Sequence, residues 1–119
     1  MRRALFLLVC LATVVAACNR KPKDEAPCGT VAARLFTIAT DDLGKATVEP
    51  ATRRAVSDQL PAMRDALTQL CTDGHWSAAA RNCMANAVDH AAFQTCQQQL
   101  TDDQRKALDR GARGETATH

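Results

Sequence analysis

Four cysteines constrain the fold of this chain more than any other feature, namely Cys28, Cys71, Cys83 and Cys96. The stretch that carries them, residues 18–119, holds only 17 leucine, isoleucine, valine, methionine, phenylalanine or tryptophan residues among 102, so its hydrophobic core is small. Small domains bury a modest share of their surface and commonly depend on covalent cross-links. An even number of widely spaced cysteines predicts two disulfides, provided that the chain folds in an oxidising compartment.

The first 17 residues predict export from the cytoplasm. Arg2 and Arg3 are followed by an apolar run over residues 4–17, which only Cys10 and Thr13 interrupt. A basic start, an apolar run of this length and small residues at its end are typical of a cleaved signal peptide. An uncleaved signal anchor is the alternative, although about 20 apolar residues are needed to span a bilayer.

The end of this leader, Val15-Ala16-Ala17-Cys18, resembles the lipobox of bacterial lipoproteins, in which one aliphatic and two small residues precede a cysteine. The resemblance implies that residues 1–17 are removed, that diacylglycerol is attached to the sulfur of Cys18, and that the new amino group is acylated with a fatty acid such as palmitate. Two or more acyl chains make membrane anchoring stable. The expected product is a lipoprotein that needs no cofactor besides the covalent lipid on Cys18.

Residues near the predicted cleavage site indicate the export route and the membrane. Arg2 and Arg3 form a twin-arginine pair, but the flanking residues of that export signal are missing, so general secretory export is favoured. Asn19 is not the aspartate that resembles an inner-membrane retention signal in Gram-negative bacteria. The lipid-anchored protein is therefore expected in the cell envelope, on the outer membrane facing the periplasm rather than on the inner membrane.

Cleavage also removes the apparent positive charge of the chain. The whole sequence has 15 basic and 13 acidic residues, and loss of Arg2 and Arg3 leaves 13 of each. A neutral mature chain gives no argument for a nucleic-acid partner.

Residues 18–27 follow the cleavage site and are predicted to be a lipidated cysteine with a flexible tether. They are mostly polar, contain two prolines and lack apolar periodicity. Nine residues reach about 30 Å when extended, so the domain would stand just clear of the lipid head groups.

Apolar side chains recur at helical spacing after the tether, which predicts a small all-α bundle of four to five helices over residues 28–110. The first helix begins at Cys28 and is expected to end at Gly44, because glycine commonly caps helix C-termini. Its apolar stripe comprises Val31, Leu35 and Ile38.

A second helix is expected from about Ala51 to Cys71, with Pro50 near its first turn, where the missing N–H matters little. Its apolar stripe comprises Val56, Leu60, Met63, Leu67 and Leu70. The stripe continues on both sides of Pro61, which favours one helix kinked near Ser57 to Pro61. Two helices, with Pro61 opening the second, are the alternative.

Three shorter helices are expected to follow. Ser77 and Asp89 are predicted N-caps of the third and fourth, and Thr101 to Gln104 form a capping box for a fifth. The fifth is expected to end at Gly111, before a disordered tail over residues 111–119. The apolar residues are Ala80, Met84 and Val88 on the third helix, Phe93, Cys96 and Leu100 on the fourth, and Leu108 on the fifth.

This layout favours one disulfide pairing. Cys28 begins the first helix and Cys71 ends the second, so an antiparallel hairpin would bring them together. Cys83 and Cys96 flank the turn between the third and fourth helices and would also face each other. The preferred pairing is therefore Cys28 with Cys71 and Cys83 with Cys96. Four cysteines permit three pairings, and the main rival joins Cys71 to Cys83 and Cys28 to Cys96.

No constellation of residues predicts catalysis or metal binding. The chain lacks C-x-x-C, H-x-x-x-H and C-x-x-C-H motifs, which argues against zinc, a disulfide oxidoreductase and haem attachment. Asp102 and Asp103 fit helix capping better than acid–base chemistry, and no nucleophile elbow or phosphate loop is present. Catalytic residues and metal ligands are therefore not expected.

Several polar and aromatic residues could serve as binding groups. His75 and Trp76 are adjacent, but Trp76 is expected to fill the core over the first turn of the helix that follows it. His90 is expected to be solvated. A mixed solvated face is expected from Arg53, Arg54 and Arg64 with Asp58 and Asp65.

The stretch from Cys71 to Gln104 contains Trp76, Cys83 and the pattern Cys96-x-x-x-Leu-Thr-Asp-Asp-Gln. This stretch is similar to small cysteine-containing helical lipoproteins of unassigned function in Gram-negative bacteria. The resemblance covers about a third of the chain and implies no activity.

Three functions are compatible with these features. The favoured one is a membrane-anchored binding or accessory module that presents a surface to an envelope protein. An alternative is a periplasmic inhibitor or immunity-like protein that blocks an enzyme, because a rigid scaffold reduces the ordering cost of binding. An enzyme or redox carrier is the least favoured, since no catalytic motif is present.

Overall fold

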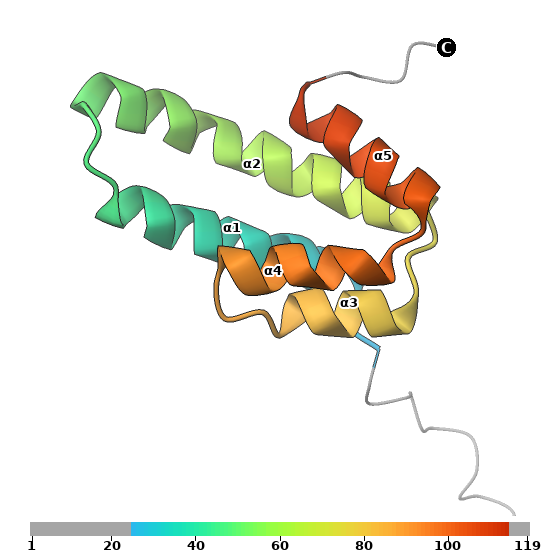
Figure 1. Cartoon of the computed structure of the whole chain (residues 1–119). Coiled ribbons are helices and arrows are strands. Elements are labelled where there is room, and N and C mark those ends of the chain that lie inside the picture. Colours follow the sequence, from blue (N-terminus) through green and yellow to red (C-terminus); the bar gives the residue numbers. More distant parts are fainter. Residues whose placement is uncertain (1–24, 115–119) are drawn as a thin grey trace, which may run out of the picture.

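The computed structural model describes residues 25–114, so the predicted leader, Cys18 and the last five residues lie outside the described part. Residues 25–114 form five α-helices and one short 3₁₀ helix, with no strand (Figure 1). The elements are α1 (Cys28–Lys45), α2 (Pro50–Asp73), α3 (Ala78–Ala85), α4 (His90–Cys96), η1 (Gln97–Gln99) and α5 (Asp102–Ala112). The predicted all-α fold is confirmed.

Helices α1 and α2 form a long antiparallel hairpin, and the shorter helices pack at the end of it that holds the N-terminus of α1 (Figure 1). Helices α3 and α4 lie side by side against α1. Helix α5 lies against the C-terminal part of α2, on the other side of the hairpin. None of the three shorter helices covers the far end of the hairpin, where α1 leads into α2 (Figure 1).

The hydrophobic core lies where the hairpin meets the shorter helices. Its largest fully buried side chains come from four helices: Val31, Cys71, Met84 and Phe93. Trp76 is 4 % exposed and fills the same core, as predicted. No polar or charged side chain of residues 25–114 is buried, so the burial of apolar surface and the disulfides hold the interior together.

Helix α2 continues through Pro61 without interruption, so the alternative of two separate helices is wrong. Pro61 is exposed, while Leu60 before it and Leu67 after it are buried. One missing hydrogen bond in a long helix is offset here by the burial of apolar residues on both sides of the proline.

Three residues predicted for the core are exposed instead. Val56 and Met63 are 39 % and 36 % exposed, because the shorter helices pack toward the C-terminal end of α2 (Figure 1). Val88 is 78 % exposed, because α3 stops at Ala85 and the helical spacing does not reach it. Ala87, 4 % exposed, occupies the buried position in that loop.

The predicted glycine cap of the first helix is wrong. Helix α1 runs one residue past Gly44 to Lys45, and Ala46 leaves it in an extended conformation with φ of −72°. Arg53 on α2 donates hydrogen bonds to the carbonyls of Leu43 and Ala46. The guanidinium thus binds one carbonyl of the last turn of α1 and one just after the helix, and Arg53 is part of this loop rather than of a solvated face.

The predicted N-caps of the three short helices are confirmed. Ser77 Oγ accepts a hydrogen bond from the Ala80 N–H at 3.1 Å, and Asp89 Oδ1 accepts one from the Ala92 N–H at 2.8 Å. Residues Thr101–Gln104 form the reciprocal capping box. Each cap satisfies a main-chain donor that the helix itself leaves without a partner.

The predicted C-terminal boundary is too early. Helix α5 continues through Gly111 to Ala112, so the helical domain extends past residue 110. Gly111 packs closely on α2, since a Cβ built on it would lie 3.0 Å from Cδ1 of Leu70. The last turn of α5 is therefore held by a tertiary contact that helix propensity does not reveal.

Arg34 joins α1 to the loop between α3 and α4. Its Nε donates to the carbonyl of Ala87 at 2.5 Å, and its Nη2 donates to the carbonyl of Val88 at 3.3 Å. Hydrogen bonds from a charged donor typically contribute about 1.5–3 kcal/mol each.

We therefore expect Arg34→Met to lower the free energy of unfolding by about 1.5 kcal/mol in a urea titration, since methionine retains much of the apolar stem while losing the donors. The matched control is Arg54→Met on the exposed surface of α2, with an expected change within about 0.5 kcal/mol. Equal losses in the two variants would contradict a role for Arg34 in holding the loop.

Candidate functional site

Both disulfides form in the preferred pairing, and the rival pairing is wrong. Cys28 and Cys71 are joined with a Cα–Cα distance of 5.7 Å, and Cys83 and Cys96 with 5.6 Å. The first bridge closes the α1–α2 hairpin at its base, and the second joins α3 to α4. All four cysteines of residues 25–114 are thereby used.

The segment that precedes α1 is held against α3. The Ala26 N–H donates to Oδ1 of Asn82 at 2.8 Å, and Nη1 of Arg81 donates to the Ala26 carbonyl at 2.8 Å. Nη2 of Arg81 also lies 4.0 Å from Oε2 of Glu25. The domain thus begins before Cys28, so the boundary predicted between tether and domain is about two residues late.

An open hollow of about 480 Å³ lies beside this docked segment. Its lining comes from the segment, from the start of α1 and from the end of α3: Glu25, Ala26, Pro27, Thr30, Asn82, Ala85 and Asn86. The side chains supply amide and hydroxyl groups and one carboxylate. This lining can form hydrogen bonds to a polar chain, and it contains no histidine or cysteine that would provide a base or a nucleophile.

The turn between α2 and α3 places His75 and Trp76 in different environments. Gly74 ends α2, His75 adopts a φ of 49°, and the Trp76 N–H donates to the carbonyl of Cys71 at 3.2 Å. This is the Schellman arrangement, in which a left-handed residue, usually glycine, follows the helix. Because His75 is exposed and Trp76 is buried in the core, the two side chains do not form a joint binding site.

His75→Gly is expected to raise the free energy of unfolding by about 1 kcal/mol, because glycine adopts a positive φ without the steric cost that a Cβ brings. Thermal unfolding would measure the effect. Gly74→Ala provides the opposite case, since its Cβ would lie 2.8 Å from the Leu70 carbonyl oxygen and must destabilise the turn. A loss of stability in His75→Gly would mean that the steric cost of this φ is smaller than the entropy that glycine adds to the unfolded chain.

The charged residues of α2 and α5 form local surface interactions. Arg64 lies 3.5 Å from Asp65, and its guanidinium carbon stands 5.4 Å from the ring centroid of Phe36. Asp102 lies in the first turn of α5, where a negative charge is favoured by the helix dipole, and it also pairs with Arg105. Exposed pairs of this kind contribute little to stability. Apart from Arg53, the predicted solvated face is confirmed, and His90 is also exposed.

Within residues 25–114, no group of histidine, cysteine, aspartate and glutamate side chains is arranged to hold a metal ion. In the same residues, no helix combines the length and the apolar character that crossing a bilayer requires.

Sequence reasoning missed the arginines that hold loops. Arg34 stands three residues after Val31 and four before Ile38, on the same face of α1 as these buried residues. Arg81 likewise stands three residues before the buried Met84. A charged residue in register with an apolar stripe needs partners, and this signal could have marked both.

Comparison of the sequence with protein families, with curated proteins and with solved structures finds no match.

Proposed function

We propose that this chain is a bacterial envelope lipoprotein, anchored by lipid on Cys18, whose helical domain acts by presenting a binding surface. The leader and the lipobox-like Val15-Ala16-Ala17-Cys18 supply the basis for the anchor. Asn19 after the cysteine favours the outer membrane, with the domain in the periplasm.

The observation that carries the proposal is the use of the other cysteines. The four cysteines of residues 25–114 pair with one another, so neither disulfide uses Cys18. Disulfides of this kind persist in oxidising compartments such as the periplasm, where a lipoprotein domain would fold. Cys18 is then the cysteine of the predicted mature chain that remains for lipid attachment.

Metabolic labelling with a palmitate analogue tests the anchor. Cys18→Ala is expected to abolish the label and to release the domain from membranes, since two or more acyl chains supply the stable attachment. The matched control is Cys10→Ala in the leader, which is expected to keep both label and attachment. A wild-type chain without label would refute the lipid anchor.

The partner is proposed to be an envelope protein. Cross-linking in cells followed by capture of the lipidated chain is expected to return a reproducible partner, and no such partner would contradict the proposal. A tight one-to-one complex with an enzyme that loses activity would favour the inhibitor version, for which a preorganised scaffold with two disulfides is suited.

A further inference from the structure

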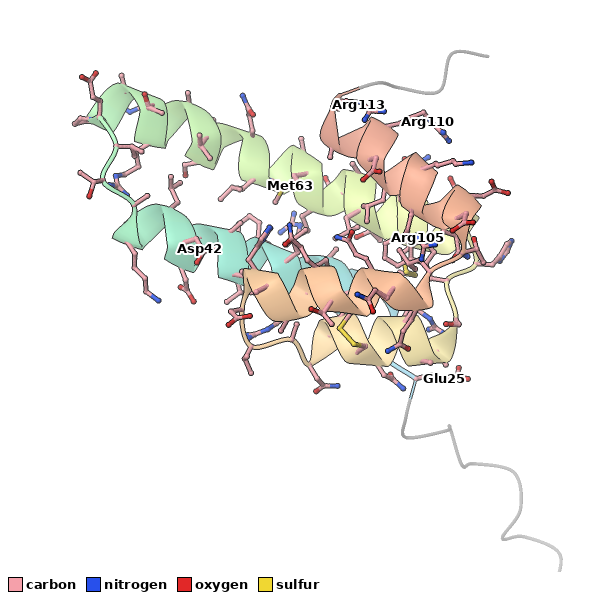
Figure 2. All side chains as sticks on the ribbon, in the orientation of Figure 1. Glu25, Asp42, Met63, Arg105, Arg110 and Arg113 are labelled. Carbon is pink, nitrogen blue, oxygen red and sulfur yellow. A yellow bond between two sulfur atoms is a disulfide. The ribbon has the colours of Figure 1, made fainter. Side chains whose placement is uncertain are left out.

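The docked segment before α1 determines where the membrane would lie. Its contacts to Asn82 and Arg81 fix residues 25–27 on α3, so the chain enters the domain at that helix. Figure 1 shows this entry below α3, with α2 and α5 on the opposite side of the domain. Figure 2 likewise shows Glu25 far from Arg110 and Arg113 on α5.

The chain length upstream of this point is short. Cys18 is seven residues before Glu25 in the sequence, a span of at most about 25 Å. A lipid on Cys18 would therefore keep the α3 side of the domain within that distance of the head groups. Docking at Ala26 also shortens the predicted tether by two residues relative to one that runs to Cys28.

The two sides differ in the density of charge. Residues 76–88, which contain α3 and the loop after it, hold one charged side chain, that of Arg81, whose Nη2 lies 4.0 Å from Oε2 of Glu25 in the docked segment. Helices α2 and α5 hold six acidic and six basic residues: Asp58, Asp65, Asp73, Asp102, Asp103 and Asp109 with Arg53, Arg54, Arg64, Arg105, Lys106 and Arg110. A face with few charges loses less hydration against lipid head groups than a densely charged face does.

Val88 adds an exposed apolar side chain to residues 76–88. It is 78 % exposed, and Arg34 holds its loop through the carbonyls of Ala87 and Val88. Asp89, the next residue, directs its carboxylate to the Ala92 N–H at the start of α4. An apolar side chain on a fixed loop can rest at the level of the head groups without an ordering cost.

We infer that the α3 face, formed by residues 76–88 with the docked residues 25–27, lies against the lipid surface, and that α2 and α5 are directed away from it toward a partner. This inference rests on the proposed lipid on Cys18. It identifies the outward surface of the proposed module as that of α2 and α5.

Paramagnetic relaxation tests the orientation on the mature, lipidated chain in nanodiscs of phosphatidylethanolamine and phosphatidylglycerol that contain a trace of gadolinium-chelating lipid. Amides of Ala79, Asn86 and Val88 are expected to relax at least about tenfold more strongly than those of Asp58 and Asp109. The effect falls with the sixth power of distance, and at least one helix layer of about 10 Å separates the two sets.

The double variant Arg81→Gln, Asn82→Ala removes the docking contacts, lengthens the tether and is expected to lower this ratio. The Ala26 amide, which loses its acceptor, is expected to exchange faster with solvent. Arg54→Gln on α2 is the matched control and is expected to leave the ratio and the exchange unchanged.

The wild-type ratio alone decides the orientation. Attachment to the nanodisc with a ratio near one, or with α2 and α5 more strongly relaxed, would overturn the inference while leaving the anchor intact. An unmodified Cys18 with no attachment would overturn the proposed anchor and the orientation together.

Discussion

Replacement of both Cys28 and Cys71 by alanine is expected to lower the free energy of unfolding by about 4 kcal/mol. The bridge spans a sequence separation of 43 residues, and in the chain-entropy treatment the stabilisation grows with the logarithm of loop length. The net stability of a small domain is about 5–15 kcal/mol, so much of it would be lost. Urea unfolding followed by the fluorescence of Trp76, the only tryptophan, would measure the change.

The second disulfide provides the matched control. Its separation of 13 residues predicts a smaller loss, about 3 kcal/mol, for the Cys83→Ala, Cys96→Ala variant. The order of the two effects is the informative result. If the Cys83→Ala, Cys96→Ala variant were the less stable of the two, loop closure would not be the main contribution of these bridges.

Phe93→Ala is expected to destabilise the domain by about 4 kcal/mol, because it removes a large side chain from the centre of the core and leaves a cavity. Phe93 is 2 % exposed and belongs to the same buried cluster as Met84 and Trp76. Thermal unfolding would report the loss as a lower melting temperature, and the far-ultraviolet circular dichroism would show whether helices persist.

Phe36→Ala tests whether position in the core, rather than ring size, sets this loss. Phe36 on α1 is only partly buried, with the guanidinium of Arg64 over its ring. Its truncation is expected to cost about 1 kcal/mol. Losses of equal size in the two variants would mean that the outer part of the hairpin contributes as much as the packed end.

Features that depend on neighbours in sequence could be predicted. Ser77 and Asp89 cap their helices by bonding to a main-chain N–H three residues ahead, so their identity and place are sufficient. Such caps need no knowledge of how distant elements pack. The disulfide pairing was preferred because Cys28 begins the first helix of a hairpin and Cys71 ends the second, but the rival pairing stayed open until the packing of the helices was known.

Features that depend on distant packing could not be predicted. Val56 follows the helical spacing of α2 but is not covered by the shorter helices, and Val88 continues the spacing of α3 in sequence although the helix ends at Ala85. Spacing alone reports neither what lies opposite a residue nor where the helix ends. The carbonyl partners of Arg34 are more than 50 residues away in sequence. The docking of Ala26 on Asn82 likewise joins residues 56 apart. The lipid on Cys18 lies outside the described residues and stays a prediction.

The positions of the two bridges also determine how the domain would carry mechanical load. A pull between the N-terminal anchor and a partner held on α5 would pass from Cys28 directly to Cys71, then along the chain to Cys83 and across to Cys96. This covalent path bypasses residues 29–70 and 84–95. The hairpin of α1 and α2 is therefore shielded from extension by such a force, which falls on residues 72–82 between the bridges, on residues 97–101 and on the packing of α5.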